Sequence, residues 1–226
     1  GQGPSETGEA PGGGGCGGGA GGDGGGDVGL GGEVASVAQD AASVTASTAS
    51  GDQSSRWLVA ADGASSPIRK SLGIAFVDQG FDQDWLVLDA RLRRPLASLS
   101  RLVQQICNPD RPTTYVTGHG PYRRWEFQLQ VGETRDEMTQ PERVWQLLEP
   151  WIGPDDAELV RAVVYRFHAT VADSMRHERV FLAGDAAHQM PPFLGQGLCS
   201  GIRDAANLAW KLELVATGVA GDRLLD

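Results

Sequence analysis

The stretch that decides the fold is Val180–Gly197, which reads VFLAGDAAHQMPPFLGQG. It predicts a short buried strand over 180–183, a sharp turn at Gly184-Asp185, a loop with two prolines and a glycine-rich turn. A long helix is expected next, because apolar residues then recur every three or four positions until Gly218. The residues expected on its apolar face are Ile202, Ala205, Leu208, Ala209, Leu212 and Val215. The stretch therefore predicts a strand that leads through a turn and a stiff loop into a helix.

Each part of this stretch offers a different kind of contact to a ligand. A carboxylate at the end of a strand, here Asp185, can accept hydrogen bonds from hydroxyl groups. Pro191-Pro192 stiffens a loop that has no spare N–H donors, so the loop can pack against an aromatic ring system. Gly195 and Gly197 allow close approach of the backbone, and the helix start beyond them presents unpaired N–H groups to an anion. These contacts suit a hydroxylated ligand with an aromatic ring that can carry negative charge.

The segment 33–75 reads as a meander that leads into a second turn motif. The expected strands are Val34–Ala38, Ser43–Ala49 and Arg56–Ala61, with a turn at Ser50-Gly51-Asp52. The last strand runs straight into Asp62-Gly63. A short helix is expected over Pro67–Leu72, because Ser66 can serve as its N-cap and proline is favoured at the first helical position.

The segment 76–162 reads mainly as a β-sheet domain. The expected strands are Trp85–Leu92, Leu102–Cys107, Thr113–Thr117 and Arg124–Val131. One amphipathic helix is expected over Pro141–Trp151, with Val144, Leu147, Leu148 and Trp151 on one face. We expect a further helix to start at Asp155-Asp156, and a strand over Val163–Thr170 in the last segment, 163–226.

The first 32 residues hold 18 of the 32 glycines and almost no large apolar side chain. Such a segment cannot offset the entropy of ordering, so we expect residues 1–32 to be disordered. It contains literal G-x-G-x-x-G matches, such as Gly12, Gly14 and Gly17. A dinucleotide fingerprint needs a strand before it and a helix after it, and neither is found here. These matches therefore reflect composition alone.

Composition excludes several classes of partner. The net charge of -10 argues against nucleic acid, because nucleic-acid binders concentrate Lys and Arg on one face. No apolar run approaches the roughly 20 residues of a membrane span, and the N-terminus lacks signal-peptide features, so we expect a cytoplasmic protein. Cys16, Cys107 and Cys199 are widely spaced, so neither disulfides nor a metal site is expected. Self-association into a homo-oligomer is left open.

Two long motifs resemble those of class A flavoprotein monooxygenases, the relatives of para-hydroxybenzoate hydroxylase. Residues 184–212 are similar to the family's GD motif, and residues 58–69, which read LVAADGASSPIR, are similar to its DG motif. Within the family, Val103–Pro109, Arg123–Phe127 and Tyr165–Ala169 most resemble the 3-(3-hydroxyphenyl)propionate hydroxylase branch. The resemblance covers about residues 33–226.

The resemblance implies an α/β fold, α+β in a truncated form, with a partial Rossmann-like FAD-binding domain and a β-sheet substrate domain. It implies an enzyme that uses FAD, NADH or NADPH, and O2 to hydroxylate a phenolic ring, such as that of a phenylpropanoid acid, through a flavin C4a-hydroperoxide. A polyketide-tailoring aromatic hydroxylase is the alternative within the enzyme class. A catalytically inactive truncated remnant is the alternative outside it.

The resemblance also assigns residues to the site. The cofactor residues it implies are Asp62, Gly63, Arg69, Gly184, Asp185, Pro191, Pro192, Gly195, Gln196, Gly197 and Leu198. The candidate substrate residues are Gln105, Trp125, Phe127 and His168. Trp125 and Phe127 fit an aromatic substrate wall or ordinary core packing, and His168 fits the cavity or a structural role. Arg124 fits a flavin contact or a solvated surface. His188 is a candidate for proton transfer over the flavin, or else shapes the turn.

The sequence departs from the family pattern at its start. The family opens with an apolar strand, a genuine G-x-G-x-x-G and a helix, and a glycine tract stands in their place here. We therefore expect a truncated or misread reading frame. Cys199 also replaces the asparagine that is usual in relatives.

Overall fold

The computed structural model describes residues 16–17 and 27–226. Its strands are β1 (Cys16–Gly17), β2 (Asp27–Val28), β3 (Val34–Gln39), β4 (Val44–Thr48), β5 (Gly51–Ser55), β6 (Leu58–Ala60), β7 (Phe76–Leu92), β8 (Gln104–Ile106), β9 (Thr113–Thr117), β10 (Tyr122–Gln128), β11 (Ala157–Ala172), β12 (Arg176–His177), β13 (Val180–Leu182) and β14 (His188–Gln189). Its helices are α1 (Pro67–Ser71), α2 (Arg135–Met138), α3 (Pro141–Leu148) and α4 (Gln196–Ala216), with the 3-10 turns η1 (Gly184–Ala186), η2 (Phe193–Gly195) and η3 (Asp222–Leu225).

The chain divides into two compact units. Unit 1 contains the described residues up to Val77 together with Thr170–Gln189 and Gly195–Asp226. Unit 2 contains Asp78–Ala169 and Met190–Leu194. Strand β7 begins at Phe76, where the sequence analysis placed its first domain boundary. Strand β11 runs without a break through the second expected boundary, at residues 162–163.

Within the glycine-rich segment, the structure describes residues 16–17 and 27–32. The disorder expected over 1–32 falls on residues 1–15 and 18–26 outside the described part of the chain. Within that part, β1 and β2 form an antiparallel pair with Cys16 opposite Val28, where no strand was expected. Backbone hydrogen bonds alone can link two such strands, so glycine-rich composition gives no sign of them.

The meander of unit 1 differs from the expected one in its third strand. β3 and β4 pair antiparallel as expected, but β4 continues into β5, so that Thr48 pairs with Gly51. All five residues of β5 are exposed, and this strand therefore lacks the apolar alternation that would reveal it. The expected third strand, Arg56–Ala61, is wrong as a meander strand, because its central part, β6, pairs in parallel with β13.

Unit 1 has a core around the small sheet of β12, β13 and β6. The buried residues of this core are Val44, Ala60, Ile68, Ile74, Ala172, Val180, Leu182 and Ala187. Helix α1 joins it through Ile68 and begins as predicted, with Ser66 as N-cap accepting a hydrogen bond from the Arg69 N–H at 2.9 Å. The core thus brings the strand before the DG motif beside the strand before the GD motif.

Helix α4 ends as predicted, because Thr217 is its C-cap and Gly218 adopts a φ of 76°. Only its C-terminal half is covered. Leu208, Leu212 and Val215 pack against Phe181 and other residues of the small cluster that contains η3. The apolar face expected from Ile202 onward is packed only in its second half, since Ile202 is 59% exposed and Ala205 and Ala209 are also exposed. The described part of unit 1 holds no element that packs against this end of α4 as a core.

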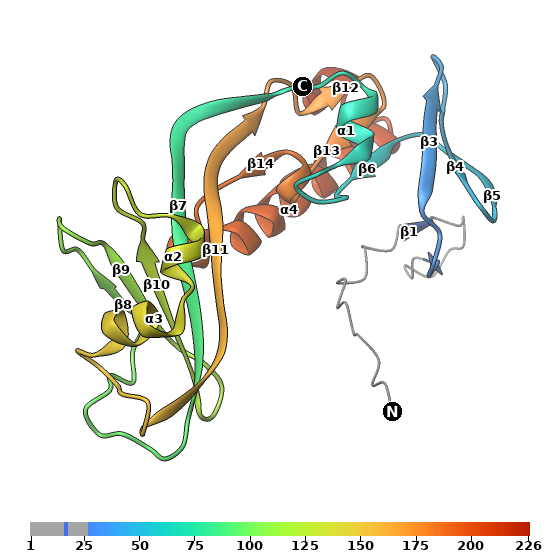
Figure 1. Ribbon diagram of the computed structural model, residues 1–226. Coiled ribbons are helices and arrows are strands. Elements are labelled where there is room, and N and C mark those ends of the chain that lie inside the picture. Colours follow the sequence, from blue (N-terminus) through green and yellow to red (C-terminus); the bar gives the residue numbers. More distant parts are fainter. Residues whose placement is uncertain (1–15, 18–26) are drawn as a thin grey trace, which may run out of the picture. The chain divides into compact units, whose positions relative to one another are not determined.

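Unit 2 is built on the sheet of order β14-β11-β7-β10-β9-β8, whose edge strand β14 is counted with unit 1. Side chains alternate between the two faces, so Trp125 and Phe127 of β10 lie on one face and Arg124, Glu126 and Gln128 on the other. Helices α2 and α3 cover the first face (Figure 1), which is the core of the unit. Its buried residues are Leu86, Leu88, Ala90, Leu92, Leu99, Tyr115, Trp125, Phe127, Met138, Val144, Leu148, Ile152 and Ala157. We call the second face the open face.

The helix expected to start at Asp155-Asp156 is wrong. Asp156 closes a turn instead, since its Oδ2 accepts a hydrogen bond from the Gly153 N–H at 3.1 Å and its Oδ1 accepts one from Arg94 at 2.9 Å. The long strand β11 then begins at Ala157. The Asp156 carboxylate therefore stabilises a turn that leads into β11, and it does not cap a helix.

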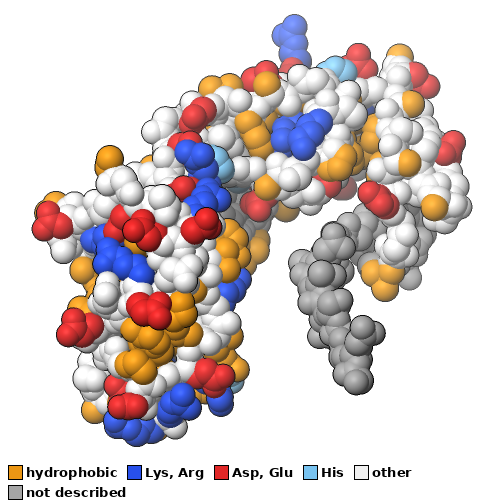
Figure 2. Space-filling view, in the orientation of Figure 1, with side chains coloured by type: hydrophobic (Ala, Val, Ile, Leu, Met, Phe, Trp, Pro, Cys, Tyr) orange, Lys and Arg blue, Asp and Glu red, His pale blue; other side chains and the backbone are white. Residues whose placement is uncertain are grey.

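Glu133 is the centre of an ion-pair cluster in unit 2. A hydrogen bond from Arg111 at 2.6 Å, the N–H of Gln130 and a second pair with Arg143 at 2.8 Å lower the pKa of the Glu133 carboxyl to about 2. Basic side chains also lie beside acidic ones elsewhere on the molecule, as the face in Figure 2 shows. The cluster ties the loop before α2 to the chain near β9 and to α3.

Replacing Trp125 by alanine should destabilise unit 2 by about 3–5 kcal/mol, because the side chain is fully buried and its loss leaves a cavity. Urea unfolding followed by circular dichroism measures the change. Trp210→Ala is the matched control, because Trp210 is 48% exposed, and it should change the free energy of unfolding by less than about 1 kcal/mol. Equal effects of the two substitutions would contradict the assignment of Trp125 to the core.

Glu133→Gln should flatten the dependence of stability on pH in the acid range. The pKa of Glu133 is lowered from an ordinary value of 4.5 to about 2, so its contribution is complete above about pH 5 and is lost as the pH falls toward 2. The variant should be less stable than the parent at pH 7, and the difference should shrink at low pH. Urea titrations between pH 7 and 2 test this, with Glu142→Gln on the exposed surface of α3 as control. Parallel pH profiles for parent and Glu133→Gln would refute it.

Candidate functional site

The Gly184-Asp185 turn follows directly from the buried strand β13. Gly184 has a φ of 59°, a left-handed conformation that favours glycine, and the turn continues as η1. The Asp185 side chain is exposed, and it has no hydrogen-bond or ion-pair partner within the described part of the chain. The turn therefore presents an unpaired carboxylate at the end of a rigid strand.

One carboxylate oxygen of Asp204 holds this turn against α4. It accepts a hydrogen bond from the Gly184 N–H at 2.9 Å and lies 2.7 Å from Nε2 of His188. A Cβ built on Gly201 would lie 3.4 Å from the Gly184 Cα, so a side chain at 201 would crowd the turn. His188 is thus engaged in shaping the turn, which agrees with the structural alternative weighed for it. The sequence analysis did not single out Asp204, which lies between Ile202 and Ala205 of the expected apolar face.

The start of α4 is the second element of the candidate cofactor site. Gly195 is its N-cap in a left-handed conformation with a φ of 63°, and no side chain caps the helix. Leu198 in the first turn is 77% exposed, and a Cβ on Gly197 would meet nothing within 4 Å. The first N–H groups of this 21-residue helix therefore face outward and carry the positive end of its dipole. Gln196 begins the helix and is itself exposed.

The DG motif is a local scaffold. Asp62 accepts hydrogen bonds from the Ser66 hydroxyl at 2.5 Å and from the Ile68 N–H at 3.1 Å, and Gly63 has a φ of 85°. Arg69 is only 4% exposed, and its guanidinium donates to the carbonyl oxygens of Ala64 at 3.2 Å and Ala186 at 3.1 Å. Arg69 thus joins the DG motif to the GD turn, and its expected place in the cofactor site stays a prediction.

The four predicted substrate residues do not come together. Trp125 and Phe127 lie in the core and are 0% and 2% exposed. Of the two alternatives for these residues, core packing therefore holds, and they do not form a substrate wall. His168 lies on β11 with Nδ1 3.2 Å from Oδ1 of Asp82. Gln105 lies on β8 and lines a hollow in unit 2. Strand alternation explains the difference, because the polar residues of β10 occupy the open face.

The hollow beside Gln105 has a volume of 230 Å³ and aromatic walls. Phe193, from the loop after Pro191-Pro192, packs at 4.8 Å between ring centroids against Trp85 and at 6.0 Å against Phe167. The lining residues are Gln83, Trp85, Gln105, Ile106, Cys107, Pro112, Thr113, Gln128 and Phe193. The predicted proline loop therefore carries an aromatic ring into this hollow.

A row of polar side chains lies on the open face beyond the hollow. Glu126 is 7% exposed, and burial raises the pKa of its carboxyl, although Arg124 and the Thr114 hydroxyl partly oppose that rise. Arg124 forms a double hydrogen bond with Asp89 at 2.7 and 3.2 Å. Arg124 is therefore not simply a solvated surface residue, because its guanidinium is bound to Asp89 on the open face. The sequence analysis did not single out Glu126 or Asp89.

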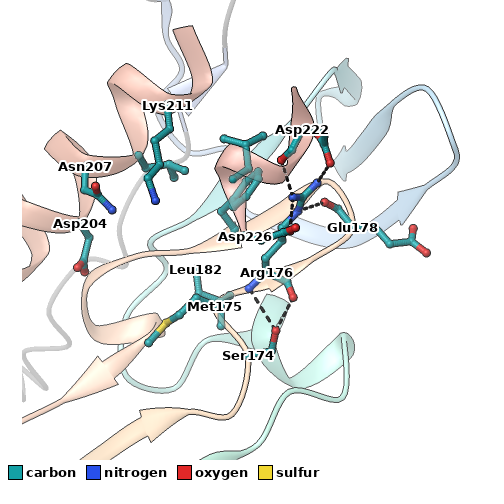
Figure 3. A pocket seen from close by; sticks show the side chains of 13 residues that line it. Ser174, Met175, Arg176, Glu178, Leu182, Asp204, Asn207, Lys211, Asp222 and Asp226 are labelled. Carbon is teal, nitrogen blue, oxygen red and sulfur yellow. Dashed lines mark hydrogen bonds and ion pairs between the residues drawn. The ribbon is translucent and has the colours of Figure 1, made fainter. Parts of the chain in front are cut away.

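A second, larger hollow of 740 Å³ lies in unit 1 and is shown in Figure 3. Asp204 and Lys211 project into it from α4, and Arg176 lies opposite, paired with Asp222 and Asp226 at 2.5 and 2.7 Å. None of the predicted cofactor or substrate residues lines it. This hollow is therefore lined by Asp204, which holds the GD turn, but not by the residues predicted to bind the cofactor.

The described residues contain neither a candidate metal site nor a candidate membrane-spanning helix. Residues 16–17 and 27–226 contain no group of three or more His, Cys, Asp or Glu side chains placed to hold a metal ion. Among the helices of that part, none has the length and hydropathy needed to cross a membrane.

Known proteins are similar to this chain in sequence. The chain is 43% identical over 172 residues to a probable NADH-specific resorcinol 4-hydroxylase of Rhodococcus jostii, with 76% of the chain and 32% of the relative covered. It is 42% identical over 185 residues to 3-(3-hydroxy-phenyl)propionate/3-hydroxycinnamic acid hydroxylase of Escherichia coli, with 79% and 32% covered. The chain therefore spans about a third of the length of these curated relatives.

Solved structures are similar as well. Aklavinone-11 hydroxylase in complex with FAD and aklavinone matches with a TM-score of 0.69 and 29% identity, covering 84% of this chain and 38% of that one. The p-nitrophenol 4-monooxygenase of Pseudomonas putida matches with a TM-score of 0.70 and 27% identity, covering 86% and 51%. Residues 20–226 match the family model described as FAD binding domain. By this match the chain belongs to the FAD-binding domain family, whose members resembling it here are aromatic hydroxylases.

Proposed function

We propose that this chain is part of a cytoplasmic FAD- and NAD(P)H-dependent monooxygenase that hydroxylates a phenolic ring. One oxygen atom of O2 enters the ring and the other leaves as water, while NAD(P)H and a proton supply two electrons and two protons. FAD, when bound, supplies the redox chemistry that connects the nicotinamide to oxygen. The residues of this chain bind, orient and shield the reactants.

The observation that carries the proposal is the unpaired Asp185 carboxylate close in sequence to an uncapped helix start. Asp185 is exposed at the end of β13 with all its acceptor capacity unused, which suits the hydroxyl groups of the ribitol chain. The N–H groups from Gln196 to Leu198 suit the part of the isoalloxazine ring that becomes anionic on reduction. Both groups are already held in place, Asp185 by the bond between Gly184 and Asp204, and α4 by its packing on unit 1.

The remaining predicted residues fall into two roles under this proposal. Gly184, Gly195 and Gly197 let the backbone approach the cofactor, and Pro191-Pro192 lies beside its ring. Asp62, Gly63 and Arg69 act indirectly, since their contacts fix the loop next to the GD turn. His188 positions that turn through Asp204 and is not assigned a proton transfer.

The substrate belongs to one of two kinds named by the relatives. One is an arylpropionate such as 3-(3-hydroxyphenyl)propionate, and the other is a dihydroxybenzene such as resorcinol. The polyketide alternative draws on the resemblance to aklavinone-11 hydroxylase. The open face of unit 2, with Gln105 and the rings of Trp85 and Phe193, offers the aromatic and polar contacts that a single phenolic ring needs.

Asp185→Asn should weaken FAD binding about tenfold or more, because the change removes a charged acceptor of hydrogen bonds. Titration of FAD with the chain, followed by flavin fluorescence and absorbance, measures the affinity. Asp173→Asn is the control, since Asp173 is also an exposed carboxylate of unit 1. A chain that leaves the spectrum of FAD unchanged at every concentration would overturn the proposed cofactor.

The chain supplemented with FAD should oxidise NADH or NADPH faster when a phenol is present. Each product molecule should contain one atom from 18O2, because one oxygen atom is transferred to the ring. Coupled measurement of NAD(P)H absorbance and product mass tests this with resorcinol, 3-(3-hydroxyphenyl)propionate and a polycyclic phenol. Bound FAD without any phenol-dependent oxidation would favour the inactive alternative.

A further inference from the structure

The hollow on the open face of unit 2 is aromatic and polar but carries no charge. Its polar side chains are the amides of Gln83, Gln105 and Gln128, the hydroxyl of Thr113 and the thiol of Cys107. None of its nine lining residues is Arg, Lys, His, Asp or Glu. Amide groups can donate to and accept from a neutral hydroxyl, but they do not neutralise an anion.

Three arginines, one next to the lining in the chain and two on the open face, are already paired. Arg111, which precedes the lining residue Pro112, donates to Glu133 at 2.6 and 2.9 Å and to the Gln128 carbonyl oxygen at 2.9 Å. On the open face, Arg124 and Arg161 share the carboxylate of Asp89. The lining of the hollow therefore offers no cation to an aryl carboxylate, and desolvating an unpaired anion is costly.

We propose that this hollow binds the phenolic ring of an uncharged substrate, a dihydroxybenzene, in preference to an aryl carboxylate. The inference rests on the proposed function and narrows its substrate. At neutral pH a phenol with a pKa near that of tyrosine, about 10, is neutral, whereas a propionate side chain with a pKa near 4 is ionised. The uncharged lining therefore discriminates between the two kinds of substrate that the relatives act on.

The size of the hollow agrees with one ring. A cavity of about 150 Å³ is enough for benzene, so this hollow of 230 Å³ has room for one ring and its hydroxyl groups. Trp85 and Phe193 provide the walls, with ring planes inclined at 60° to each other. A flat ring can pack on either wall.

Gln105 is placed to orient a ligand in the hollow. The Thr114 hydroxyl lies 3.0 Å from Oε1 of Gln105 and anchors one end of the amide. The exposed remainder of the Gln105 amide can still donate to a ligand. Thr114 is itself 3% exposed and adjoins the buried Glu126 carboxyl. Gln105 is therefore the residue that we assign to recognising an oxygen of the substrate.

Cys107 gives a direct test that does not depend on turnover. It is exposed and lines the hollow, whereas Cys199 is exposed on α4 in the other unit. Alkylation by iodoacetamide, resolved by peptide mass spectrometry, should slow at Cys107 by about fivefold when resorcinol is present at four times its dissociation constant. The alkylation rate of Cys199 should stay constant. The same concentration of 3-(3-hydroxyphenyl)propionate should give little protection.

Two variants sharpen the test. Gln105→Leu keeps the bulk and removes the donors, so protection by resorcinol should fall. Gln105→Arg adds a cation, so 3-(3-hydroxyphenyl)propionate should begin to protect Cys107. Gln53→Leu and Gln53→Arg, on the exposed strand β5 of unit 1, are the matched controls and should behave as the parent.

The outcomes separate this inference from the proposed function. Equal or better protection by the propionate in the parent chain, or no protection by either compound, would overturn the inference. If the chain then still binds FAD and oxidises NAD(P)H in the presence of a phenol, the proposed function survives. Protection by resorcinol without FAD binding would instead leave the hollow as assigned and remove the redox function.

Discussion

A single carboxylate oxygen, Oδ2 of Asp204, governs the geometry of the candidate cofactor surface. It accepts from the Gly184 N–H and from His188, so one atom of a helix fixes both ends of the turn that follows β13. Arg69 holds the same turn from the other side through the carbonyl oxygen of Ala186. With its backbone satisfied in this way, the turn can leave Asp185 unpaired and exposed. The Asp185 carboxylate can therefore stay available to a ligand, because the backbone groups around it are hydrogen-bonded to Asp204 and Arg69.

The second constraint is the two-residue period of β10. Placing Trp125 and Phe127 in the core obliges Glu126 to face the other way, where it is 7% exposed with a raised pKa. Apolar packing therefore selects which polar residues reach the open face. On that face Asp89 forms ion pairs with both Arg124 and Arg161. These charged groups are therefore already paired with each other and are less available to a ligand.

The sequence predicted those features that depend on local chemistry. The N-cap at Ser66, the end of α4 at Gly218 and the strand Thr113–Thr117 all have signals within a few residues, and the structure confirms them. Features that depend on distant partners were missed. Nothing near Gly51–Ser55 indicates a strand, because its exposed polar residues depend only on pairing with β4. The hydrogen bonds from Gly184 to Asp204 and from Arg69 to Ala186 were likewise not predicted, since the partners lie 20 and 117 residues apart along the chain.

The loop that carries Phe193 has a consequence for how such a protein can change over time. Met190–Leu194 belongs to unit 2, although the residues on both sides of it in the chain belong to unit 1. Phe193 lines the aromatic hollow, and Gly195, two residues later, starts the helix of the cofactor surface. Insertions or deletions that reshape ring recognition at this point would also shift the phase of that helix. Diversification of ligand preference should therefore proceed through point substitutions on β8 and β10, and the length of this connection should stay fixed.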